Sequence, residues 1–124
     1  MPRNNDIQEN LKCGIIEILI LSLLYEEDMY GYQLKNEMED RSGGTFLVKQ
    51  GSLYVPLYRM EQQGKISSYK EQAGERRVRV YYHIEEAGKE YLRHAIGEFR
   101  RIFDGANNII KGCKINDETT ESSS

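Results

Sequence analysis

The last long segment of the sequence, residues 86–110, carries its apolar side chains on two neighbouring tracks of a helix. One track advances in steps of four and three residues and the other in steps of seven. The two tracks consist of Leu92, Ile96, Phe99, Phe103, Ala106 and Ile110, and of Ala95, Ile102 and Ile109. Together they make an apolar face wider than a coiled-coil seam requires. Because 124 residues supply one core, we expect this face to bind both its own domain and a second copy of the chain.

A second helix is predicted over residues 50–64. Leu53, Leu57 and Met60 follow the spacing of one buried helix face, and Gly64 ends the helix. Pro56 removes one backbone hydrogen bond, so we expect a bend. With Leu53 pointing inward, the outward positions are Ser52, Val55, Tyr58, Arg59 and Gln62. This predicted face carries hydrogen-bonding groups and one cation but no carboxylate.

A basic hairpin is predicted directly after that helix. Residues 65–69 and 78–84 read as strands, the second with clear alternation of apolar and polar side chains. The loop between them, residues 71–77, contains Gly74 and two arginines. From Lys49 to His83 the chain has seven basic and three acidic residues, whereas the whole chain has a net charge of −3. This uneven distribution favours one element that contacts a polyanion.

Two helices are predicted before residue 50. The first spans residues 11–25 and is apolar on more than one side, so that part of its surface is expected to contact another subunit. For the second, Asp28 is the expected cap, Leu34 and Met38 face inward, and the glycines after Ser42 end it. The order of elements is that of a winged helix-turn-helix. We therefore expect a mainly α fold with a small β-hairpin: a winged helix-turn-helix over residues 11–84, a C-terminal dimerisation helix over residues 85–111, and flexible termini over residues 1–10 and 112–124.

Several classes of protein are excluded by what the sequence lacks. The longest apolar run, residues 15–25, is too short to span a membrane, and the first residues do not resemble an export signal, so we expect a cytoplasmic protein. Cys13 and Cys113 have no neighbouring metal ligands and are expected to be reduced thiols. No phosphate-binding glycine loop, nucleophile elbow or HExxH motif is present. We therefore expect neither an enzyme nor a bound cofactor or metal.

Three stretches of the sequence resemble the PadR family of bacterial transcriptional regulators. They are residues 30–34, 51–66 and 81–88, and the similarity extends from about Cys13 to Ile110. The short tail is similar to that of the smaller PadR subfamily, which has a single C-terminal helix. Two positions depart from the family pattern. The proline of the helix predicted over residues 50–64 is displaced by one residue. Glu85 stands where the family has a threonine that caps the last helix, which leaves the capping role to Glu85 or to water.

The resemblance implies a homodimeric repressor that binds a palindromic operator in double-stranded DNA and is released by a small molecule, for which an aromatic or hydrophobic compound is one candidate, or by another signal. The positions predicted to contact DNA are Lys49, Gln50, Ser52, Tyr54, Tyr58, Arg59, Gln62, Arg76, Arg77 and Arg79. The positions predicted to line the dimer interface or an effector site are Ile15, Leu19, Leu92, Ile96, Phe99 and Phe103. For Phe99, lining a cavity between subunits and packing in the dimer core both remain open. An alternative function is that of a winged-helix protein-interaction module that does not bind DNA.

Overall fold

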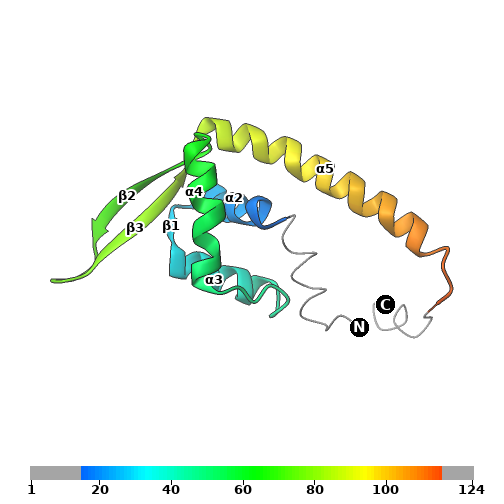
Figure 1. Ribbon diagram of the computed structural model, residues 1–124, viewed down its shortest axis with the longest axis horizontal. Coiled ribbons are helices and arrows are strands. Elements are labelled where there is room, and N and C mark those ends of the chain that lie inside the picture. Colours follow the sequence, from blue (N-terminus) through cyan, green and yellow to red (C-terminus); the bar gives the residue numbers. More distant parts are fainter. Residues whose placement is uncertain (1–14, 116–124) are drawn as a thin grey trace. The chain divides into compact units, whose positions relative to one another are not determined.

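The computed structural model describes residues 15–115, which form five helical elements and three strands (Figure 1). In chain order these are α2 (Ile16–Glu26), β1 (Met29–Tyr30), α3 (Gly31–Arg41), the 3₁₀ helix η1 (Gln50–Leu53), α4 (Tyr54–Gln62), β2 (Ile66–Gln72), β3 (Val78–Ile84) and α5 (Glu86–Ile110). The chain divides into two compact units, with the boundary between Arg93 and His94, inside α5. The first unit therefore contains the winged helix-turn-helix elements and the beginning of α5.

The core of the first unit lies between α2, α3 and α4. Helix α2 is buried at Ile20, Leu21, Leu23 and Leu24. These positions make one broad face of the helix, and Leu19 and Ser22 on the remaining side are only partly buried. Leu34 and Met38 of α3 are also buried, which confirms the expected inward face. The helix ends at Arg41, and Gly43 and Gly44 follow with positive φ angles, a conformation that glycine adopts without strain.

The segment predicted as one bent helix, residues 50–64, is divided in two. Residues 50–53 form η1, and α4 begins at Tyr54, two residues before Pro56. Pro56 thus occupies the first turn of α4, where backbone N–H groups have no partner within the helix, so its missing N–H costs little. Its ring is buried in the core together with Leu57. The change to a 3₁₀ turn therefore takes the place of the expected bend.

The sheet has three antiparallel strands in the order β1-β3-β2. The hairpin β2-β3 was predicted, although β2 continues to Gln72 instead of ending at Tyr69. Strand β1 was not predicted, because two residues are too few to show alternation. The predicted apolar face of β3 is buried only near the end of the strand: Tyr82 and Ile84 are buried, whereas Val78 and Val80 are exposed. The far part of the hairpin thus extends beyond the body of the unit (Figure 1).

The base of the hairpin is packed tightly against the first turns of α5. The backbone N–H of Glu85 donates a hydrogen bond to the carbonyl oxygen of Lys65 at 2.9 Å. A Cβ atom on Gly88 would lie 2.2 Å from that same carbonyl oxygen, so glycine permits this close approach. The ammonium group of Lys65 lies 3.6 Å from the centre of the Tyr91 ring. These contacts connect the hairpin to α5.

Helix α5 begins and ends at the predicted residues, Glu86 and Ile110. Within the first unit its Leu92 is buried. In the second unit the helix exposes most of the large side chains of its apolar tracks, namely Phe99, Ile102, Phe103, Ile109 and Ile110. Residues 112–115 are exposed, and Cys113 is a free thiol. The predictions for residues 1–14, which include Leu11 and Cys13, and for residues 116–124 lie outside the described part of the chain.

The predicted cap of α3 is wrong. No side chain caps this helix, and its N-cap residue is Tyr30. The carboxylate of Asp28 instead accepts hydrogen bonds from the Tyr69 hydroxyl at 2.7 Å and from Nδ1 of His83 at 2.8 Å. Both partners lie more than 40 residues away in sequence, so the local pattern gave no sign of them. Asp28 therefore attaches the sheet to the turn before α3.

Candidate nucleic-acid interface

The outward face of α4 is exposed at every position predicted for it. Ser52, Val55, Tyr58, Arg59 and Gln62 are all exposed. Val55 and Tyr58 are 66% and 67% exposed, although both carry large apolar groups. Because the opposite side of the helix is held in the core by Leu57 and Met60, this face has a fixed orientation and remains available to a partner.

Arg59 is paired with a carboxylate of another helix, a contact that the prediction for the face of α4 itself did not include. Its Nε and Nη2 atoms lie 2.7 and 2.6 Å from Oε2 of Glu17 in α2. Glu17 is 42 positions upstream, and the sequence does not specify which side of α2 faces α4. The arginine side chain remains about half exposed, but its charge is balanced. An anion that binds Arg59 must therefore compete with the carboxylate of Glu17.

Three predicted DNA-contacting residues cluster where α3 and α4 begin. The side-chain amide of Gln50 donates a hydrogen bond to the Tyr54 hydroxyl at 3.4 Å. Both side chains lie beside Gly31, the first residue of α3. Lys49 is exposed just before η1 and forms no ion pair within residues 15–115. This corner therefore has one uncompensated cation and two polar groups.

The loop of the hairpin presents two further uncompensated cations, Arg76 and Arg77. Both are exposed, and neither forms an ion pair with any described residue. The loop itself is held by backbone and side-chain hydrogen bonds. The N–H of Ala73 donates to the carbonyl of Arg77, and the Gln72 amide donates to the carbonyls of Gly74 and Glu75. The two arginines are therefore carried on an ordered turn.

Arg79 and Lys70 lie on opposite faces of the hairpin. Ser68 donates a hydrogen bond to Glu61 of α4, which identifies the face that is turned toward that helix. Lys70, two residues further along β2, shares this face, is exposed and has no ion-pair partner in the described chain. The predictions omitted it, because the strand was expected to end at Tyr69 and the contact between Ser68 and Glu61 that identifies this face is not visible in the sequence. Arg79 lies on the other face, with its guanidinium 4.3 Å from the Tyr30 ring centre.

Aromatic rings and a hydrogen-bonded carboxylate stabilise the face that carries Arg79. Tyr81 is stacked on Tyr69 at 5.7 Å and meets Tyr30 edge-on at 5.4 Å. The hydrogen bond to Asp28 raises the pKa of Tyr69 to about 12. Burial opposes the ionisation of Asp28, but the hydrogen bonds from Tyr69 and His83 outweigh it and lower the pKa of this carboxyl. These groups hold the hairpin at its base.

The predicted interface and effector residues fall into three environments. Ile15 and Leu19 are partly buried at the beginning of α2. Leu92 is almost fully buried in the first unit, so it offers little surface to a ligand or a second subunit. Phe99 and Phe103 are exposed in the second unit, with ring centres 6.2 Å apart, and Ile96 is partly buried.

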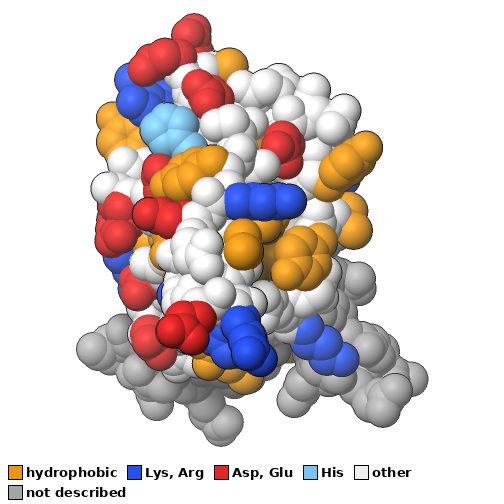
Figure 2. Space-filling view, turned by 90° about the vertical axis from the view of Figure 1, so that its left-hand side faces the viewer, with side chains coloured by type: hydrophobic (Ala, Val, Ile, Leu, Met, Phe, Trp, Pro, Cys, Tyr) orange, Lys and Arg blue, Asp and Glu red, His pale blue; other side chains and the backbone are white. Residues whose placement is uncertain are grey.

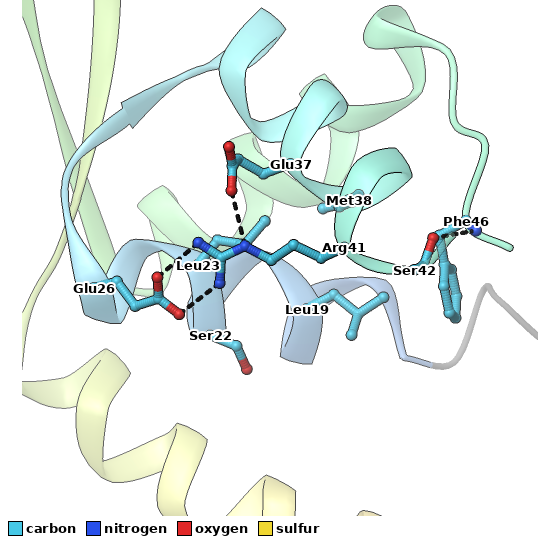
Figure 3. A pocket seen from close by; sticks show the side chains of 9 residues that line it. All are labelled: Leu19, Ser22, Leu23, Glu26, Glu37, Met38, Arg41, Ser42 and Phe46. Atoms are coloured by element: carbon cyan, nitrogen blue, oxygen red, sulfur yellow. Dashed lines mark hydrogen bonds and ion pairs between the residues drawn. The ribbon is translucent and has the colours of Figure 1, made fainter. Parts of the chain in front are cut away.

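A cavity of about 270 Å³ lies between α2 and α3 (Figure 3). Its apolar wall includes Leu19, Leu23 and Met38. At its edge, Arg41 joins the two helices: its guanidinium donates two hydrogen bonds to Glu26 and one to Glu37. The cavity is therefore apolar with a charged edge whose hydrogen bonds are made within the chain.

Positive charge does not form one continuous patch on the hairpin side of the molecule. Figure 2 shows the cationic side chains of that face separated by acidic and hydrophobic ones.

Among the described residues, no group of three or more His, Cys, Asp or Glu side chains could hold a metal ion. None of the described helices combines the length and the hydropathy that crossing a bilayer requires.

The model of the PadR-like transcriptional regulator family matches residues 20–94. This chain belongs to the PadR family. The match includes the helix-turn-helix, the hairpin and the beginning of α5. Members of this family are transcriptional regulators and not enzymes, which agrees with the expectation from the sequence.

Solved structures of family members have the same fold. A PadR family regulator from Eggerthella lenta is 26% identical, with a TM-score of 0.75 and 90% of this chain and 93% of that chain covered. A PadR-like regulator from Bacillus cereus is 30% identical, with a TM-score of 0.71 and coverages of 84% and 99%. PadR from Bacillus subtilis, solved in complex with operator DNA, is 21% identical, with a TM-score of 0.62 and coverages of 66% and 46%.

Proposed function

We propose that this PadR-family regulator is a cytoplasmic homodimeric repressor that binds operator sequences in double-stranded DNA. The observation that carries this proposal is the combination, within one compact unit, of an exposed polar face on α4 and uncompensated cations on the adjacent hairpin loop. A helix of this kind fits the major groove, and a basic hairpin fits the phosphates beside it. The operator complex of Bacillus subtilis PadR supports duplex DNA as the partner.

The predicted residues have different roles in this proposal. Ser52, Tyr58 and Gln62 face the base edges, whereas Arg76, Arg77 and Lys49 bind phosphates as point charges. Gln50 and Tyr54 contact the backbone where α3 and α4 begin. Arg59 contacts DNA in competition with Glu17, and Arg79 reaches phosphates from the far face of the hairpin. To these we add Lys70, which lies on the α4 side of the hairpin.

Binding to DNA should depend steeply on salt. In a fluorescence-anisotropy titration, the protein should bind duplex DNA from the intergenic region upstream of its own gene. Several phosphate contacts predict that affinity falls about a thousandfold between about 50 and 200 mM salt. Absence of binding at about 50 mM salt would contradict the proposal and would favour the protein-interaction module.

Dimerisation should depend on the exposed apolar tracks of α5. A Phe103→Glu variant places a charge within the apolar face and should sediment as a monomer at micromolar concentration, where the native protein sediments as a dimer. The matched control is Arg101→Glu, which introduces the same side chain about 200° around the helix and should remain dimeric. A native protein that is monomeric under these conditions, or a Phe103→Glu variant that stays dimeric, would refute dimerisation through this face.

An effector site between the two subunits is part of the same proposal. The exposed rings of Phe99 and Phe103 are close enough to form one aromatic surface, and such a surface fits a flat aromatic or hydrophobic compound. A bound compound would favour a dimer geometry that does not bind DNA. Crystals soaked with planar aromatic compounds test whether one of them binds against Phe99.

A further inference from the structure

We infer that Val55 determines operator specificity by contacting the C5 methyl group of a thymine in the major groove. This inference rests on the proposed function and assigns a base to one position of the α4 face. Val55 was predicted to point outward, but it was not among the residues predicted to contact DNA. In the structure the side chain of Val55 is exposed to solvent, and the inference rests on this exposure.

Val55 exposes two thirds of its surface on the outward face of α4, in the first turn of the helix. The neighbouring outward positions on the helix are Ser52, Tyr58 and Gln62, which carry hydrogen-bonding groups. A β-branched side chain is a poor choice for an exposed helix position, because the helix restricts its rotamers and it gains no packing. The Val55 side chain is not packed in the core of the unit, so the apolar surface of Val55 is available to a partner.

The major groove offers such a side chain one apolar target. The edges of guanine, cytosine and adenine present donors and acceptors there, whereas thymine also presents a methyl group. The usual competitor on such a face is an arginine that binds guanine. Here Arg59 is held by two contacts to Glu17, so an apolar contact from Val55 can discriminate between bases beside the hydrogen-bonding residues of the same face.

The test removes single methyl groups from the DNA. The protein first selects its preferred site from a random duplex library. Each thymine of one half-site is then replaced in turn by deoxyuridine, which lacks the methyl group but keeps the hydrogen-bonding edges. At one position we expect anisotropy to show affinity reduced about fourfold, the loss that one buried methyl group predicts.

The variant Val55→Ala should bind the thymine duplex about sixteenfold more weakly, about fourfold for each half-site of the dimer, and should not distinguish it from the deoxyuridine duplex. Val78→Ala is the matched control, since Val78 is comparably exposed but lies on the hairpin, and it should keep the full methyl dependence. Circular dichroism verifies that both variants are folded. The inference is overturned if the native protein tolerates every deoxyuridine, or if Val55→Ala retains the dependence. A protein that selects no duplex at all contradicts the proposed function itself.

Discussion

A Gly88→Ala variant is expected to lose about 3 kcal/mol of unfolding free energy. The added Cβ would lie 2.2 Å from the carbonyl oxygen of Lys65 and 2.9 Å from Cγ1 of Ile84. The first of these atoms belongs to the backbone, and the same carbonyl accepts the hydrogen bond from Glu85. The clash can therefore be relieved only by moving α5 away from the base of the hairpin. Urea denaturation followed by circular dichroism measures the loss.

Gly97→Ala is the matched control for this effect. Gly97 is also an interior residue of α5, but a Cβ atom there would meet nothing within 4 Å. Because alanine is the better helix former, this variant should be about 0.5–1 kcal/mol more stable than the native protein. Equal stability changes in the two variants would mean that helix propensity, and not the contact with Lys65, governs position 88.

The double variant Arg76→Ala/Arg77→Ala is expected to bind operator DNA on the order of 100-fold more weakly at about 150 mM salt. In a dimer the change removes four cations, none of which forms an ion pair with residues 15–115 of its own subunit. If each binds one phosphate, the slope of the logarithm of affinity against the logarithm of salt concentration decreases by about 3 to 4. Stability should remain within about 0.5 kcal/mol, because both side chains are exposed.

The control for net charge is Arg100→Ala/Arg101→Ala. It removes the same charge from exposed positions of the second unit, outside the candidate interface, and should leave the salt slope nearly unchanged. If the two double variants lose affinity equally, the hairpin loop has no special role and the affinity reflects net charge alone.

The helix bounds show how much of the fold could be read from the sequence. Helix α5 was predicted to the residue, because two apolar tracks repeat over its whole length. The outward face of α4 was also predicted, since one inward residue fixes the direction of the others at 100° per residue. The two-residue strand β1 was missed, because its only signal is its pairing with β3.

The candidate site shows the same division. Which α4 residues are exposed followed from helical periodicity. The pairing of Arg59 with Glu17 and the position of Arg79 over Tyr30 did not, because each joins elements that are distant in sequence. Whether an arginine is free, paired with a carboxylate or held over an aromatic ring therefore depended on contacts that no local pattern records. This distinction separates Arg76 and Arg77 from the other two arginines.

By itself, the sequence determined the type and order of the elements, the apolar faces of the helices and the residues on the outward face of α4, because each of these follows from a repeat along the chain. Only the tertiary structure decided that Asp28 holds the sheet instead of capping α3, that Glu17 neutralises Arg59, and that Gly88 admits a carbonyl oxygen. The physical reason is that hydrogen bonds, ion pairs and close packing depend on distances in space, which periodicity along the chain does not specify.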